Sequence, residues 1–97
     1  MMHNLEIQLD SRYAIPKGIQ FRYEDFGGIV YRRRDDKLFF LSSRIAMDLL
    51  IMANSGTVGE IINMMEKSNQ PQDKIKEKVL KVLNSLRERG IIYELAR

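Results

Sequence analysis

The sequence has no cysteine, no tryptophan and one histidine, His3, among its 97 residues. The absence of cysteine excludes disulfides, thiolate metal sites and thiol nucleophiles together. A single histidine is a poor ligand set for zinc or iron, so we expect no tightly bound metal and no organic cofactor. No run of about 18 apolar residues occurs, and no charged segment followed by an apolar one opens the chain. We therefore expect a cytoplasmic protein without a membrane partner.

The composition that is present is typical of a globular domain, with 44% hydrophobic and 30% charged residues. The length suffices for one modest core and is too short for a substrate domain plus a cofactor domain. Sixteen Lys and Arg against 13 Asp and Glu give a net charge of +3. This charge favours acidic partners without requiring nucleic acid.

Two segments near the start alternate apolar and polar residues with the period of a strand. Residues 4–10 do so first, which predicts either a strand or an ordered arm. After Pro16 and Gly18, residues 19–24 alternate again and predict the first strand of a sheet with one buried face.

A hairpin is predicted next. Gly27 and Gly28 lead into an outgoing strand over residues 29–34, and Asp35-Asp36 forms a polar tip before the returning strand, 37–41. The returning strand contains four consecutive apolar residues instead of an alternation. We therefore expect something to cover both of its faces.

Three helices are predicted after the hairpin. The first begins at the Ser42-Ser43 pair and ends near Gly56. The second opens on the capping box of residues 57–60 (Thr-Val-Gly-Glu), and the third follows a break at 68–71 and ends at Gly90. Their predicted buried stripes are Ile45, Leu49, Met52 and Ala53; Val58, Ile61, Ile62 and Met65; and Ile75, Val79, Val82, Leu83 and Leu86.

The order of these elements predicts the fold class. At most one short strand fits after the third helix. Packing three helices on one face of a small sheet is the economical way to bury every predicted stripe. The sequence thus predicts a winged-helix-like α+β fold, with a three-stranded antiparallel sheet followed by three helices.

Several segments resemble the PqqD-like peptide chaperones, also called RiPP recognition elements. Residues 22–31 and 37–42 look like the family's hairpin, 56–62 like its second-helix start, and 79–92 like its third helix and exit. Within the family, the Glu-Asp-Phe-Gly-Gly and Leu-Phe-Phe-Leu segments look closest to the mycofactocin-system chaperone. The likeness starts at residue 19, so we divide the chain into an N-terminal arm or extra strand, 1–18, and a PqqD-like peptide-binding domain, 19–97.

The resemblance implies a non-catalytic chaperone for the leader of a ribosomally synthesised precursor peptide. The leader would add as a strand to the third sheet strand, rest against the third helix, and be presented to a radical SAM maturase in mycofactocin-like biosynthesis. The implied site residues are Lys37, Leu38, Phe39, Phe40 and Leu41 on the strand, with Lys76, Val79, Leu80, Leu83 and Arg87 on the helix. The sequence leaves open which flank of the third helix faces the peptide, the one with Lys76, Leu80 and Arg87 or the one with Lys74, Lys78 and Lys81.

The residues support strand addition independently of the resemblance. Strand addition requires an open sheet edge and pockets for alternate side chains, and an apolar edge strand at 38–41 would supply both. The N-terminal segment, through Leu5, Ile7 and Leu9, is an alternative occupant of this surface. Both hold if that segment occupies the site when no peptide is bound.

Two other functions rank lower. Arg32-Arg33-Arg34 and Lys37 could contact phosphates, but Asp35-Asp36 dilutes the patch, and a DNA-binding winged helix usually places its wing after the recognition helix. A nucleic-acid-binding regulator is therefore the second hypothesis. Catalysis is the third, because the adjacent carboxylates at 24–25 and 35–36 diverge along the chain and no thiol, histidine or phosphate loop accompanies them.

Overall fold

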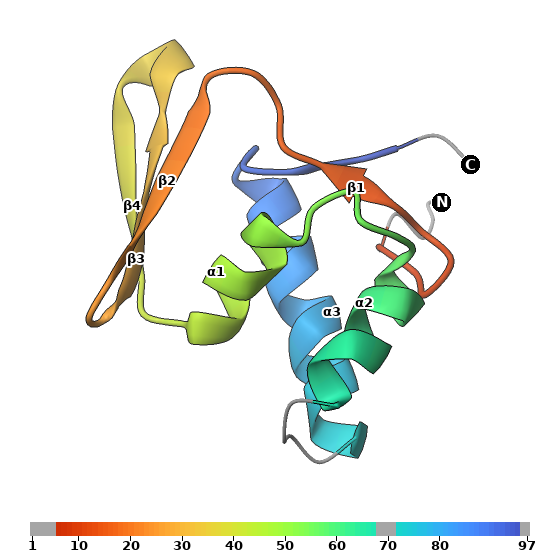
Figure 1. Cartoon of the computed structure of the whole chain (residues 1–97). Helices are drawn as coiled ribbons and strands as arrows, with labels where there is room; N and C mark the ends of the chain where they lie inside the picture. The colour runs from red at the N-terminus through yellow and green to blue at the C-terminus, as the bar shows by residue number, and fades with distance from the viewer. Residues whose placement is uncertain (1–5, 68–71, 96–97) are drawn as a thin grey trace.

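The computed structural model describes residues 6–67 and 72–95 and has an α+β fold. Figure 1 shows the large sheet as one layer and the helices as the other. The predicted three-stranded antiparallel sheet followed by three helices is confirmed. His3, Leu5 and the break at 68–71 lie outside the described residues. The elements are β1 (Tyr13–Ala14), β2 (Ile19–Glu24), β3 (Gly27–Arg32), the 3-10 turn η1 (Arg33–Asp35), β4 (Lys37–Leu41), α1 (Arg44–Ile51), α2 (Val58–Glu66), α3 (Gln72–Glu88) and β5 (Tyr93–Glu94).

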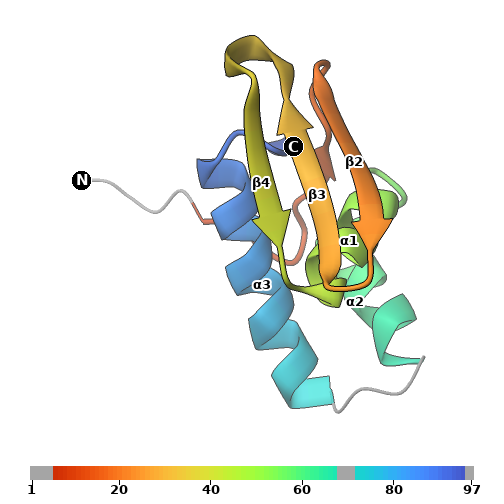
Figure 2. The same cartoon turned by 90° about the vertical axis from the view of Figure 1, so that its left-hand side faces the viewer.

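The large sheet has the strand order β2-β3-β4. Val30 pairs with Phe21 on one side and Phe39 on the other, so these three side chains share the inner face that packs on the helices. Leu38 and Phe40 point to the outer face and are 51% and 66% exposed. The prediction that both faces of this strand are covered is wrong, because all three helices lie on the inner side (Figure 2).

The starts of α1 and α2 agree with their predicted caps. Ser43, one of the two predicted candidates, accepts a hydrogen bond from the Ala46 amide at 3.1 Å and caps α1. The capping box between Thr57 and Glu60 is present at the start of α2. At the end of α3, Gly90 has a φ of 73°, a left-handed conformation that favours glycine.

The first helix is shorter than predicted. It ends at Ile51, before Gly56, and Asn54 takes a left-handed conformation with a φ of 61°. Its buried residues are Ala46, Met47, Leu49 and Leu50, while Ile45, Met52 and Ala53 are only partly buried. The stripe of α2 is buried as predicted, as is that of α3 apart from Val82, which is partly buried.

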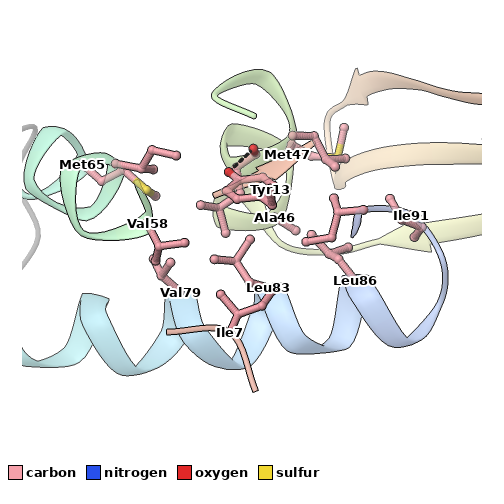
Figure 3. Close-up of a cluster of buried hydrophobic side chains, with 14 of the residues drawn as sticks. Ile7, Tyr13, Ala46, Met47, Val58, Met65, Val79, Leu83, Leu86 and Ile91 are labelled. Atoms are coloured by element: carbon pink, nitrogen blue, oxygen red, sulfur yellow. Dashed lines mark hydrogen bonds between the residues drawn. The ribbon is translucent and has the colours of Figure 1, made fainter. Parts of the chain in front are cut away.

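The N-terminal segment contributes to the same core as the helices. Ile7 is buried among core side chains (Figure 3), and its amide donates to Asn84 Oδ1 of α3 at 3.0 Å. The Leu9 carbonyl accepts from the Gly59 amide at 2.8 Å, at the start of α2. Residues 6–10 therefore form the predicted ordered arm without strand structure. Ile7 and Leu9 lie against the helices, so the alternative in which they cover β4 is wrong.

Tyr13 connects β1 to α1. It is fully buried, its hydroxyl donates to the Leu49 carbonyl at 2.5 Å (Figure 3), and burial raises its pKa well above the ordinary value. The two-residue strand β1 pairs antiparallel with β5, with Ala14 opposite Tyr93. In the described parts of the chain, no helix is long and apolar enough to cross a membrane.

Candidate functional site

The free edge of β4 lies beside α3. In the strand order β2-β3-β4, no strand of the described residues pairs with β4 on its outer side. In Figure 2 the later turns of α3 lie behind this edge, and Arg89, which follows α3, contacts Phe39 of β4. An unpaired strand edge carries main-chain donors and acceptors that another extended chain can bind.

The hydrogen-bond register determines which β4 peptide groups face this free edge. The Arg33 amide, one residue beyond β3, donates to the Gly18 carbonyl at 2.8 Å, so the backbone of Arg33 faces β2. Because the backbone groups of an antiparallel strand alternate sides, Val30 faces β4, where its partner is Phe39. The peptide groups of Phe40 therefore point to the open edge.

The outer face next to this edge is apolar. Leu38 shares the orientation of Phe40. Phe26, in the turn between β2 and β3, is 49% exposed. The Phe26 and Phe40 rings lie with their centroids 6.3 Å apart. A shallow hollow of about 300 Å³ adjoins Leu38, with Ile29 and Arg22 in its lining. Apolar side chains of an added strand could pack here.

The inner side of the edge is cationic. Three positive side chains lie over the partly buried ring of Phe39: Arg32 Cζ at 5.0 Å, Lys37 Nζ at 5.5 Å and Arg89 Cζ at 5.8 Å from its centroid. These separations are within the range of cation–π attraction. Arg89 directly follows α3, so the cluster joins the end of that helix to β4.

Only one of these three cations is neutralised within the described structure. Arg32 makes two hydrogen bonds to the Asp35 carboxylate, at 2.9 and 2.7 Å, and also donates to the Arg89 carbonyl. The bonds to Asp35 lower the pKa of that carboxyl and raise the pKa of Arg32. Neither Lys37 nor Arg89 forms an ion pair with a described carboxylate. Two uncompensated positive charges therefore remain at the junction of β4 and α3.

The contact between Arg89 and Phe39 shows which flank of α3 faces β4. Residues three or four positions apart lie on the same side of a helix, so Lys78, Val82 and Ser85 share the flank of Arg89. Val82 on this flank is partly buried, and Lys78 is exposed. Of the two flanks that the sequence left open, the one with Lys78 is thus the one beside the sheet.

The flank with Lys76, Leu80 and Arg87, which the predicted site includes, lies beside the N-terminal arm and β5 instead of β4. Arg87 forms an ion pair with Glu94 of β5 at 3.4 Å. Lys76 lines a hollow together with Leu9 of the N-terminal arm. The next helix residue on this side, Asn84, holds the arm. Helical periodicity could not show which flank lies beside the sheet, because the elements that cover the two flanks come from distant parts of the chain.

The remaining predicted site residues divide between surface and core. Phe39 lies under Lys37 and Arg89, and Leu38 and Phe40 form the outer face. Val79 and Leu83 are fully buried in the core, so neither is available to a bound peptide in this structure. Leu41 is 8% exposed at the end of the strand. Sequence reasoning missed Arg89 and did not assign Arg32 to this site, because 57 positions separate these residues along the chain.

Three of the four adjacent carboxylates at 24–25 and 35–36 have partners close to them in the chain. Glu24 pairs with Arg22 at 2.5 Å, Asp35 pairs with Arg32, and Asp36 accepts from the Tyr31 hydroxyl, which raises the pKa of Tyr31. Within residues 6–67 and 72–95, no group of three or more His, Cys, Asp or Glu side chains could hold a metal ion.

Comparison with solved structures finds the same fold in a lasso peptide synthetase B1 complexed with the leader peptide. The match has a TM-score of 0.68 at 12% sequence identity, and it covers 84% of this chain and 98% of that one. At this identity the likeness establishes the fold alone. No family model and no curated protein matches the sequence.

Proposed function

We propose that this protein is a non-catalytic chaperone that binds the leader of a ribosomally synthesised precursor peptide. The observation that carries the proposal is the open β4 edge, where the peptide groups of Phe40 face outward between an apolar face and a basic helix flank. An extended peptide would bind by main-chain hydrogen bonds, with side-chain contacts giving selectivity. The shared fold with a synthetase component solved with a leader peptide supports this function.

The finer assignment follows the sequence resemblance. We propose that the bound leader is presented to a radical SAM maturase in a mycofactocin-like pathway. Purified maturase should modify the precursor faster when this protein is added, and a precursor without its leader should show no such acceleration. Equal modification rates with and without this protein would contradict the presentation role while leaving peptide binding intact.

A proline substitution at the open edge tests strand addition. Phe40→Pro removes an outward-facing amide, which a sheet edge tolerates, so the variant should remain folded. It should bind a candidate leader peptide at least about fivefold more weakly than the parent does, the effect of losing one net hydrogen bond. Calorimetric titration measures the affinity, and thermal melts confirm folding.

Two matched variants serve as controls. One distinguishes loss of the Phe40 amide from loss of its ring, and the other distinguishes the open edge of β4 from the side that pairs with β3. Phe40→Ala removes the ring but keeps the amide, so it should bind the leader more tightly than Phe40→Pro. Phe39→Pro should lower the thermal midpoint, because its amide faces β3. If Phe40→Pro binds as well as Phe40→Ala does, β4 is not the docking edge.

Duplex DNA is the probe for the competing regulatory function. Nucleic-acid affinity falls steeply with salt because binding releases condensed counterions, whereas strand addition to an apolar edge depends less on salt. We expect leader binding to persist from about 50 to about 200 mM salt and DNA binding to be weak at both concentrations. Tight, steeply salt-dependent DNA binding without leader binding would reverse the assignment.

A further inference from the structure

We infer that the β4 edge selects peptides in which an acidic residue and an apolar residue are separated by an odd number of positions. This inference rests on the proposed function and specifies the class of peptide. Side chains of a strand alternate between the two faces of its sheet. An added strand would therefore direct every second side chain toward the Phe39 cluster and the others toward the outer face.

The inward side chains of such a strand meet unneutralised positive charge. Lys37 and Arg89 both lie over Phe39, and neither pairs with a described carboxylate. A peptide Asp or Glu directed inward would contact exposed cations without displacing Asp35 from Arg32.

The outward side chains meet a different surface. Phe40, Leu38 and Phe26 expose apolar area there, and the nearby Arg22 already pairs with Glu24. An apolar peptide residue covers this area, while an acidic residue gains no free cation from that ion pair. The two faces thus select opposite side-chain chemistry, and strand alternation makes the permitted separation odd.

The test begins with selection from a displayed library of random peptides, about 12 residues long, on the full chain. Peptides that bind the parent should be enriched in Asp or Glu with apolar residues one or three positions away. The variant Lys37→Gln/Arg89→Gln should lose the acidic preference. The variant Arg12→Gln/Lys67→Gln removes one arginine and one lysine charge from exposed positions away from β4 and should keep the acidic preference.

A direct titration then measures the acidic contact. One selected peptide is compared with its Glu→Gln form. The Glu→Gln form should bind the parent about fivefold more weakly than the selected peptide does. The Lys37→Gln/Arg89→Gln variant should bind the two peptides with equal affinity. Selected peptides without an acidic preference, or with even separations, would overturn this inference and leave strand addition standing. If the parent selects no peptide at all, both this inference and the proposed function are wrong.

Discussion

Arg89, the first residue after α3, has its guanidinium carbon 5.8 Å from the centre of the Phe39 ring on β4. This contact joins the C-terminal end of the longest helix to the inner face of the edge strand. Arg32 completes the junction by stacking on the same ring and donating to the Arg89 carbonyl. Phe39 is therefore a point of contact between the end of α3 and the edge strand.

The first prediction compares Phe39 with its neighbour on the opposite face. Phe39→Leu removes the ring under three cations and should lower the free energy of unfolding by about 1–2 kcal/mol. Phe40→Leu changes a side chain that is 66% exposed and should alter it by less than about 0.5 kcal/mol. Urea unfolding measures both. An equal loss in the two variants would contradict the described orientation of β4.

The second prediction concerns the N-terminal arm. Ile7 is 2% exposed and Leu9 is 40% exposed. Ile7→Ala should destabilise the protein by about 2–4 kcal/mol through lost burial and a cavity, and Leu9→Ala by less than about 1 kcal/mol. Folded Ile7→Ala should keep its leader affinity, because the arm packs away from β4. If Ile7→Ala costs no more than Leu9→Ala, the arm is not part of the core.

The third prediction uses the two glycines that open β3. A Cβ on Gly27 would lie 2.1 Å from the Leu41 carbonyl oxygen at a φ of 142°, whereas one on Gly28 would meet the Met47 side chain at 2.3 Å. Both alanine variants should be destabilised by more than about 1 kcal/mol. Only the Gly28 clash involves a side chain that a second substitution can remove.

A double-mutant cycle with Met47→Ala separates the two cases. The loss in Gly28→Ala/Met47→Ala should be smaller than the sum of the single losses by about 1 kcal/mol, because the added methyl group occupies vacated space. Gly27→Ala/Met47→Ala should be additive within about 0.5 kcal/mol. Additivity in the Gly28 pair would show that Met47 does not contact Gly28.

The fourth prediction is a pH dependence at the start of α2. The Thr57 amide donates to the Glu60 carboxylate at 2.8 Å, which lowers the pKa of Glu60. A lowered pKa in the folded state stabilises the protein above the unfolded pKa of about 4.3, and this contribution is lost as pH falls through the folded value. Glu60→Gln should thus be less stable than the parent at pH 7, and the difference should shrink on acidification below about pH 4.

Thermal melts from about pH 7 to about pH 2.5 measure this difference. Glu77→Gln, an exposed change on α3, serves as the control for removing one negative charge. Its stability relative to the parent should vary less over this pH range than that of Glu60→Gln. A gap between Glu60→Gln and the parent that stays constant with pH would show that the capping box contributes nothing through its charge.

The sequence by itself determined the features that depend on neighbouring residues. The capping box at Thr57 and Glu60, the stop at Gly90 and the turn of the β3–β4 hairpin each arise within a few positions, so local chemistry predicts them. Period-two and helical patterns likewise identified most of the buried side chains, because amphipathic elements must bury their apolar face. These signals were enough to predict three strands followed by three helices.

Only the tertiary structure decided which element covers which surface. Periodicity shows that a face is buried but not what buries it, so the outer face of β4 was wrongly expected to be covered. For the same reason, the flank of α3 beside the sheet could not be chosen. Three contacts join residues that are far apart in the chain: Arg89 with Phe39, Ile7 with Asn84 of α3, and β1 with β5. Such contacts form because the whole core closes, and no local pattern records them.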